Sequence, residues 1–137
     1  MKLSDLYKII EFGDCGDERG KLVVIETDGI DIPMDVKRVF YIYGSDADVV
    51  RGQHANRKTE FVMVNVSGTS KVKVENGTES VIVELNRPGM GLYLSTMVWK
   101  EMYDFSEDSV LLVLASEHYQ EQEYIRDYNA FLKEVNA

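Results

Sequence analysis

The polar stretch 51–60 holds the chain's best candidate for acid–base chemistry. Its imidazole, His54, is one of only two histidines, and it lies between Arg51 and Arg57. Histidine can take up and return a proton at physiological pH because its ordinary pKa lies close to neutrality. Neighbouring arginines would attract an anion, so the stretch predicts an anion-binding pocket that contains a titratable group. The alternative is a polar loop with one exposed histidine.

The distribution of charge favours a small anionic ligand. The net charge is −9, which argues against nucleic acid and against an anionic membrane as partners. Within residues 37–58, however, bases outnumber acids. A local basic cluster on an acidic protein can bind a small polyanion, such as the pyrophosphate of a sugar nucleotide. A solvated surface of mixed charge is the alternative interpretation.

The length and composition indicate one cytoplasmic domain, residues 1–137. Hydrophobic residues make up 45% of the chain, enough for a buried core. No apolar run approaches the roughly 20 residues that span a membrane, and the N-terminus has no signal-peptide pattern. A single cysteine, Cys15, excludes an internal disulfide and fits a reducing compartment.

The sequence offers few residues for a metal or cofactor site. It has no glycine-rich phosphate loop, no Cys-x-x-Cys pair and no nucleophile elbow. His54 and His118 are too few for a typical jelly-roll metal site, although His54 with Glu60 and Glu101 could form a weak one. We therefore expect neither a metal nor a cofactor.

Short apolar runs separated by glycine and asparagine turns predict an all-β chain. Val72 and Val74 alternate with polar residues before Asn76-Gly77, a strong hairpin signal, and the alternation resumes at Val81. Further strands are expected at 22–26, 36–43, 61–66, 91–94, 97–102 and 110–115. This number of strands predicts a β-barrel or a double-sheet jelly roll, with a sandwich lacking a ligand cavity as the competitor.

The C-terminal segment is the only predicted helix. Its apolar residues are spaced by three or four and would share one face: Tyr124, Tyr128, Phe131, Leu132 and Val135. We expect this face to pack against the sheet or against a partner chain.

A series of short motifs resembles one known family. In order, the motifs are Asp17-Glu18-Arg19-Gly20-Lys21-Leu22, Val36-Lys37-Arg38-Val39-Phe40-Tyr41-Ile42, Arg51-Gly52-Gln53-His54-Ala55, Gly91-Leu92-Tyr93-Leu94, Trp99-Lys100-Glu101-Met102, Phe105-Ser106, Val113-Leu114-Ala115-Ser116 and Tyr124-Ile125-Arg126-Asp127-Tyr128. Together they cover nearly the whole chain. The chain resembles the sugar-nucleotide 3,4-ketoisomerases of the WxcM-like cupin group.

The resemblance implies a metal-free cupin jelly roll that forms a homodimer by exchanging strands. It also implies a substrate, dTDP-4-keto-6-deoxyglucose, whose carbonyl moves from C4 to C3 through an enediolate. This reaction needs a base for the C3 proton, groups that stabilise the enediolate, and an acid that protonates C4.

The family motifs also imply roles for individual residues. His54 matches the base, and Tyr41 could donate a proton or a hydrogen bond. The expected substrate-binding residues are Arg19, Arg38, Arg51, Arg57, Trp99, Lys100 and Glu101. Glu101 would lie near the sugar or orient His54.

One departure from the family pattern affects the chemistry. The third expected catalytic residue, Asn56, stands where many members have a second histidine. Its amide can hydrogen-bond an enediolate but cannot carry a proton at neutral pH. The proton for C4 would then come from His54, from Tyr41 or from water, so the gluco or galacto configuration of the product stays open. Two alternative functions remain: another keto-sugar epimerase or isomerase of this fold, and a non-catalytic cupin that binds a sugar nucleotide.

Overall fold

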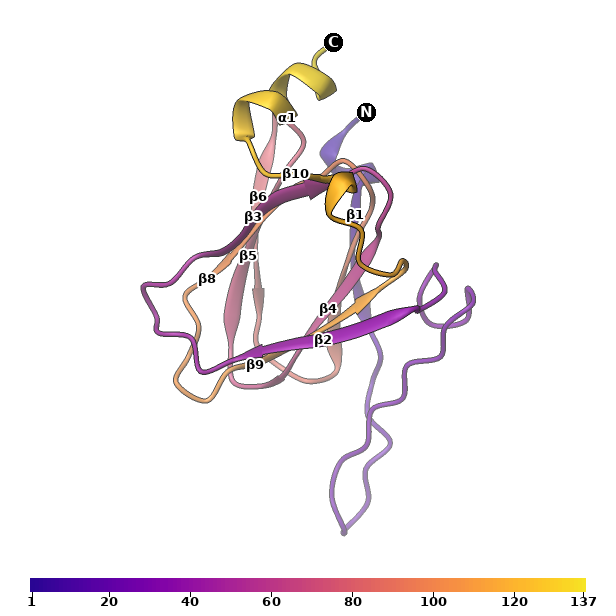
Figure 1. Cartoon of the computed structure of the whole chain (residues 1–137). Coiled ribbons are helices and arrows are strands. Elements are labelled where there is room, and N and C mark those ends of the chain that lie inside the picture. The colour runs from indigo at the N-terminus through magenta and orange to yellow at the C-terminus, as the bar shows by residue number, and fades with distance from the viewer.

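The computed structural model describes residues 1–137 and contains two antiparallel five-stranded sheets (Figure 1). The first sheet has the order β1 (Tyr7–Glu11), β7 (Met90–Leu94), β4 (Phe61–Ser67), β9 (Val110–Ala115) and β2 (Arg38–Tyr43). The second has the order β10 (Tyr124–Ile125), β3 (Arg51–Asn56), β8 (Trp99–Tyr103), β5 (Ser70–Glu75) and β6 (Ser80–Leu85). The prediction of an all-β double-sheet jelly roll is confirmed.

Three short helices complete the fold. Two single 3₁₀ turns, η1 (Leu3–Asp5) and η2 (Glu121–Glu123), precede β1 and β10. The one α-helix, α1 (Tyr128–Val135), lies at the C-terminal end, near the N-terminus in Figure 1. Asp127 caps it, since its carboxylate accepts a hydrogen bond from the Ala130 N–H. No helix of the structure is both long and apolar enough to cross a membrane.

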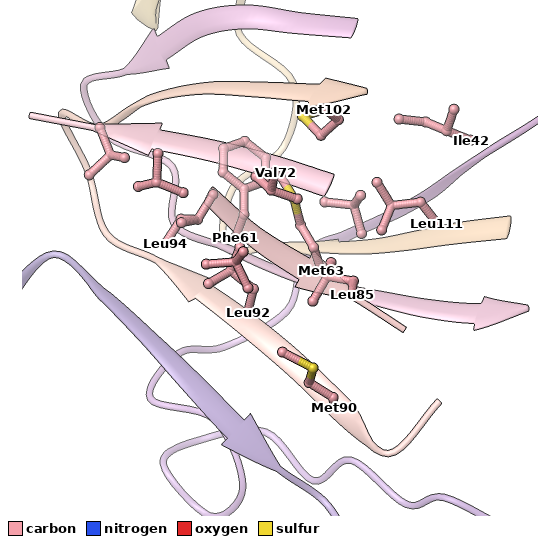
Figure 2. Close-up of a cluster of buried hydrophobic side chains, with 14 of the residues drawn as sticks. Ile42, Phe61, Met63, Val72, Leu85, Met90, Leu92, Leu94, Met102 and Leu111 are labelled. Atoms are coloured by element: carbon pink, nitrogen blue, oxygen red, sulfur yellow. The ribbon is translucent and has the colours of Figure 1, made fainter. Parts of the chain in front are cut away.

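The core lies between the two sheets because alternate residues of each strand point inward. Phe61 and Met63 of β4 face Val72 of β5 and Met102 of β8, and all four are buried (Figure 2). The predicted hairpin is confirmed, with Val72 paired to Val83 and the Asn76 carboxamide accepting backbone hydrogen bonds within the turn. This core holds the two sheets in fixed positions on either side of the site.

Several element predictions were wrong at the two ends of the chain. Residues 22–26 form no strand, although their composition favours one, because no strand of the same chain lies beside them. Three strands, β1, β3 and β10, were not predicted. Tyr124 belongs to β10 instead of the C-terminal helix, which begins only at Tyr128.

Residues 13–27, here called the arm, extend away from both sheets (Figure 1). A few hydrogen bonds close the arm on itself, including one from the Cys15 N–H to the Leu22 carbonyl. Leu22 and Val24 are exposed on it. The chain returns to the body of the protein at Ile32 and Met34, which are buried against the outer face of β4.

Candidate active site

A cavity of about 620 Å³ lies between β2 of the first sheet and β3 and β8 of the second. Its volume falls in the range of small-molecule sites. Four of its sixteen lining residues are Arg38, Arg51, Lys100 and Arg126, and none is an aspartate or a glutamate. Aromatic rings occupy much of the remaining wall: Phe40, Tyr41, Phe61, Tyr119 and Tyr124. A protein of net charge −9 thus has a cationic, aromatic cavity suited to a nucleotide diphosphate.

An irregularity in β3 presents His54 to this cavity. The pairing with β8 shifts register between Gly52 and His54, as in a β-bulge. Gly52 and Gln53 both have positive φ values, 85° and 56°. A Cβ on Gly52 would lie 3.0 Å from the Lys100 carbonyl oxygen, so this position favours glycine. The strained backbone at Gln53 fits a segment shaped by the site.

His54 is held in its neutral form. Burial lowers the pKa of the imidazole to about 3, and the nearby charges of Lys100 and Arg126 lower it in the same direction. The ring lies edge-on to Tyr124, with 4.9 Å between centroids. Its Nδ1 is buried and has no hydrogen-bond partner in the protein. His54 lines the cavity, and a neutral imidazole in that position can accept a proton from a ligand.

Lys100 faces His54 from the neighbouring strand. The two residues are directly paired in the antiparallel register of β3 and β8, so their side chains are neighbours on one face. Only 1% of Lys100 is exposed. Its Nζ donates one hydrogen bond, 3.3 Å to Asn56 Oδ1, and lies 5.1 Å from the centre of the Phe61 ring. Burial lowers the pKa of Lys100 to about 7, against the opposing charge of Glu123.

Glu123 fixes the residues behind Lys100. Its carboxylate accepts four hydrogen bonds, from Asn56 Nδ2 (2.6 Å), the Lys58 and Thr59 backbone N–H groups, and the Thr59 hydroxyl. Burial raises the pKa of Glu123, but these hydrogen bonds outweigh burial and lower it overall. Asn56 is fully buried and does not line the cavity, in contrast to the expected catalytic position. It orients Lys100 instead.

Arg38 extends the cationic wall from β2. Its Nη2 donates to the Tyr124 hydroxyl (3.2 Å), and the guanidinium lies 5.6 Å from the Tyr119 ring centre. Its Nε is buried and has no hydrogen-bond partner in the protein. Arg51 and Arg126 are exposed, so they lie nearer the mouth.

The structure brings five of the predicted site residues together at the cavity: Arg38, Tyr41, Arg51, His54 and Lys100. Tyr41 reaches only its border, since 62% of the residue is exposed and its ring lies near that of Tyr43 on the outer face of β2. Strand periodicity explains this, because Arg38, Phe40 and Ile42 point inward on the same strand.

The other predicted residues lie elsewhere in this chain. Trp99 and Glu101 point to the face of β8 opposite Lys100, where the Trp99 Nε1 donates to Glu101 (3.0 Å). Glu101 therefore does not orient His54. Arg57 pairs with Glu134 on the surface, and Arg19 pairs with Asp17 on the arm. No group of three or more His, Cys, Asp or Glu side chains is arranged to hold a metal ion.

Among the wall residues that sequence reasoning missed, three carry polar groups: Tyr119, Tyr124 and Arg126. Arg126 lies 4.7 Å from the Tyr124 ring centre. Tyr124 and Arg126 both belong to the motif 124–128. The spacing of Tyr124 relative to Tyr128 and Phe131 predicted a helix, whereas Tyr124 lies on a short strand. The pairing of Tyr124 with Asn56, on the strand that carries His54, brings this motif to the cavity.

Comparison with known proteins identifies the family of this chain. The family model "FdtA: WxcM-like, C-terminal" matches residues 5–136. The chain belongs to the FdtA family. It is 42% identical over 128 residues to the TDP-4-oxo-6-deoxy-alpha-D-glucose-3,4-oxoisomerase of Aneurinibacillus thermoaerophilus, covering 93% of this chain and 91% of that protein.

Two solved structures of ketoisomerases superpose closely on this FdtA-family chain. A 3,4-ketoisomerase from Helicobacter canadensis is 41% identical, with a TM-score of 0.92 over 96% of this chain and 98% of that one. A variant of the 3,4-ketoisomerase QdtA from Thermoanaerobacterium thermosaccharolyticum, in complex with TDP-4-keto-6-deoxyglucose, is 44% identical, with a TM-score of 0.91 over 95% and 94% of the two chains. The resemblance to the WxcM-like ketoisomerases is confirmed.

Proposed function

We propose that this chain is a 3,4-ketoisomerase of dTDP-4-keto-6-deoxyglucose, with His54 as the base that removes the C3 proton. The observation that carries the proposal is a neutral, buried imidazole in a cavity that contains four basic residues and no carboxylate. The identity and coverage of the ketoisomerase relatives support the same substrate class.

Each part of the cavity has a role in this reaction. The arginines would pair with the pyrophosphate oxygens, for which a planar guanidinium fork is well matched. The rings of Tyr119 and Tyr124 provide surfaces for the base or the sugar. His54 takes the proton from C3, and the electrons of that C–H bond form the C3–C4 double bond of an enediolate. Positive charge from Arg38 and Lys100 would stabilise the oxygen at C4.

Proton NMR of the substrate and protein in D₂O tests the activity. Deuterium at C3 of the remaining substrate together with new 3-keto signals is the expected result. In a parallel reaction in H₂O, the coupling of the new C4 proton would distinguish a gluco from a galacto product. His54→Asn should abolish turnover while leaving dTDP binding, measured by calorimetry, nearly unchanged.

His118→Asn is the matched control, since His118 is exposed and outside the cavity, and it should retain full activity. Binding of the nucleotide sugar without exchange at C3 or product would contradict the isomerase and favour a non-catalytic sugar-nucleotide-binding protein.

We further propose that two copies assemble by exchanging their arms. β2 is an edge strand, and it exposes Val39, Tyr41 and Tyr43. The arm exposes Leu22 and Val24 and has no strand partner in its own chain. Apolar edges and arms of this kind pair readily with another chain. An arm placed along the partner's β2 would bring Arg19 toward the partner's cavity, the position expected from the family motif.

Light scattering and complementation test this assembly. A mass of one 15.6 kDa chain at micromolar concentration would contradict the dimer. Arg19→Ala and His54→Asn should each impair the homodimer, whereas coexpression restores one intact site in each mixed dimer. Random pairing would then recover roughly a quarter of the wild-type activity, because half of the dimers are mixed and each has one working site. Failure to recover activity would place Arg19 in its own chain's site or outside any site.

A further inference from the structure

The proposed carbonyl shift must move two protons, and His54 can account for only one of them. One proton leaves C3 and another arrives at C4, which a single imidazole between the two carbons can perform. The second transfer joins the oxygens, because the C3 hydroxyl becomes a carbonyl and the C4 carbonyl becomes a hydroxyl. This second transfer needs another proton carrier beside both oxygens, either a side chain or water.

Few groups at the cavity can carry that proton. Arginine does not deprotonate in proteins, which excludes Arg38, Arg51 and Arg126. The Tyr124 hydroxyl already accepts a hydrogen bond from Arg38, and the Tyr41 ring points to the outer face of β2. No carboxylate lines the cavity. Tyr119 also lines the wall, but 56% of it is exposed and its ring lies against that of Tyr124. Apart from His54, Lys100 is the one buried side chain of the wall that can both donate and accept a proton.

We propose that Lys100 carries the proton between the two sugar oxygens, while His54 carries the other proton between the two carbons. This inference rests on the proposed ketoisomerase function. The placement of Lys100 directly opposite His54 sets the two groups side by side on one face of the sheet, so they can reach the same two-carbon unit.

The hydrogen bonding of Lys100 leaves it free for this transfer. An ammonium group has three donors, and only one is used within the protein, toward Asn56 Oδ1. Asn56 is itself held by Glu123, so the amine has a fixed position but no direct carboxylate partner. With a pKa of about 7, the amine populates both its charged and its neutral form near neutral pH. It can therefore both give a proton and take one up near neutral pH.

The protons and electrons balance without a cofactor. Charged Lys100 gives a proton to O4 as His54 removes the proton from C3, which leaves neutral lysine, imidazolium and an enediol. Lys100 then removes the proton from O3, the O3 electrons form the C3 carbonyl, and the double-bond electrons take the proton from His54 at C4. Both side chains return to their initial states, and no oxidant or reductant is consumed.

Lys100→Met and Lys100→Arg test this role in the full-length protein. Methionine has a similar length and no charge, so it removes the proton carrier without opening a large cavity. Arginine keeps the positive charge but does not release a proton. For each variant and the wild type, three quantities are measured: dTDP binding by calorimetry, deuterium entry at C3, and formation of the 3-keto product.

We expect both variants to bind dTDP within a few-fold of the wild type, because exposed arginines remain at the mouth of the cavity. Product formation should fall by about 100-fold or more in both, the usual contribution of a general acid–base group. Deuterium entry at C3, which depends on His54, should fall less than product formation. Lys133→Met, on the exposed face of α1, is the control and should match the wild type.

Several results would overturn the proposal. Near-wild-type turnover in Lys100→Arg would show that a fixed charge suffices, and near-wild-type turnover in Lys100→Met would show that the group is not needed. Loss of dTDP binding in Lys100→Met would make Lys100 a binding residue. A wild-type protein with neither C3 exchange nor product would instead contradict the ketoisomerase function, and this inference with it.

Discussion

His54 and Lys100 face each other across β3 and β8, and burial acts on both in the same direction. Each would be charged or partly charged in water at neutral pH, and the low-dielectric cavity favours the neutral form of each. Their mutual repulsion adds to this effect on His54. At the scale of the residue, the site is therefore defined by two neighbouring bases with lowered pKa values.

The titration of His54 gives a direct prediction. Because its pKa is lowered to about 3, its imidazole C–H signals should not shift between pH 8 and about pH 5 in the ligand-free protein. The unfolded chain takes up this proton near pH 6.5, so His54 makes the folded state less stable as the pH falls from there toward 3. A His118→Gln variant identifies the His54 signals by NMR. A midpoint near pH 6.5 would contradict the buried site.

The titration of Lys100 predicts a pH dependence of stability with a definite sign. Its pKa falls from 10.5 to about 7 on folding, so between these values the unfolded chain binds more protons and stability rises with pH. Lys100→Met should therefore raise the free energy of unfolding most at and below about pH 7, on the order of a few kcal/mol. The gain should shrink toward pH 10. Urea denaturation at several pH values measures it.

The exposed Lys133 provides the comparison for that experiment. Lys133→Met should change the free energy of unfolding little at any of these pH values. A gain in Lys100→Met that is small at pH 7, or that grows toward pH 10, would contradict a lowered Lys100 pKa.

At the scale of the element, the two faces of β8 have different surroundings: one lines the cavity and the other packs against the C-terminal helix. Lys100 and Met102 point into the cavity, whereas Trp99 and Glu101 point toward the opposite face. On that face α1 covers the sheet, and Phe131 packs against Trp99 with 5.7 Å between ring centres. The helix thus supports the strands that carry His54 and Lys100 without reaching the cavity.

Removing the Phe131 ring should destabilise the protein without changing its chemistry. Phe131 is fully buried, so Phe131→Ala should lower the free energy of unfolding by about 3–5 kcal/mol. Activity per folded molecule should persist, because no atom of α1 lines the cavity. Urea denaturation measures the loss, and Lys133→Ala on the same helix should change stability by less than about 0.5 kcal/mol. A loss below about 1 kcal/mol would show that the helix contributes little.

At the scale of the whole molecule, charge is segregated. The chain carries a net charge of −9, yet the cavity wall is exclusively basic in its charged residues. Closely grouped charges dominate the local potential because salt screens charges farther apart than about 8–10 Å. An anionic ligand should therefore be attracted to the cavity despite the acidic surface elsewhere.

Binding of dTDP should accordingly weaken as salt is added. Arg51→Gln or Arg126→Gln should lower the affinity by about 10-fold, the loss of one charge-assisted hydrogen bond, and should reduce the salt dependence. Calorimetry in low and high salt measures both effects. Arg87→Gln is the control, because Arg87 pairs with Glu11 on β1 outside the cavity. An affinity that rises with salt would show that the net charge dominates.

The sequence determined the fold class and the family because both depend on local patterns. Alternating β-branched runs and an Asn76-Gly77 turn are enough to specify inward and outward faces of strands. The motif around His54 sufficed to select this residue as the proposed base. The same patterns predicted a strand at 22–26 that does not form, since extended conformation requires a partner strand as well as propensity.

The tertiary structure alone decided which residues share the cavity. Both faces of β8 carry a large apolar residue, Trp99 and Met102, so the sequence could not tell that Lys100 points inward and Glu101 outward. The strand that carries His54 was not predicted because the bulge at Gly52 interrupts the alternation of inward and outward side chains. Only the long-range pairing of β3 with β8 places a buried lysine against the histidine. That contact arises from register and packing between distant segments, which local sequence patterns do not encode.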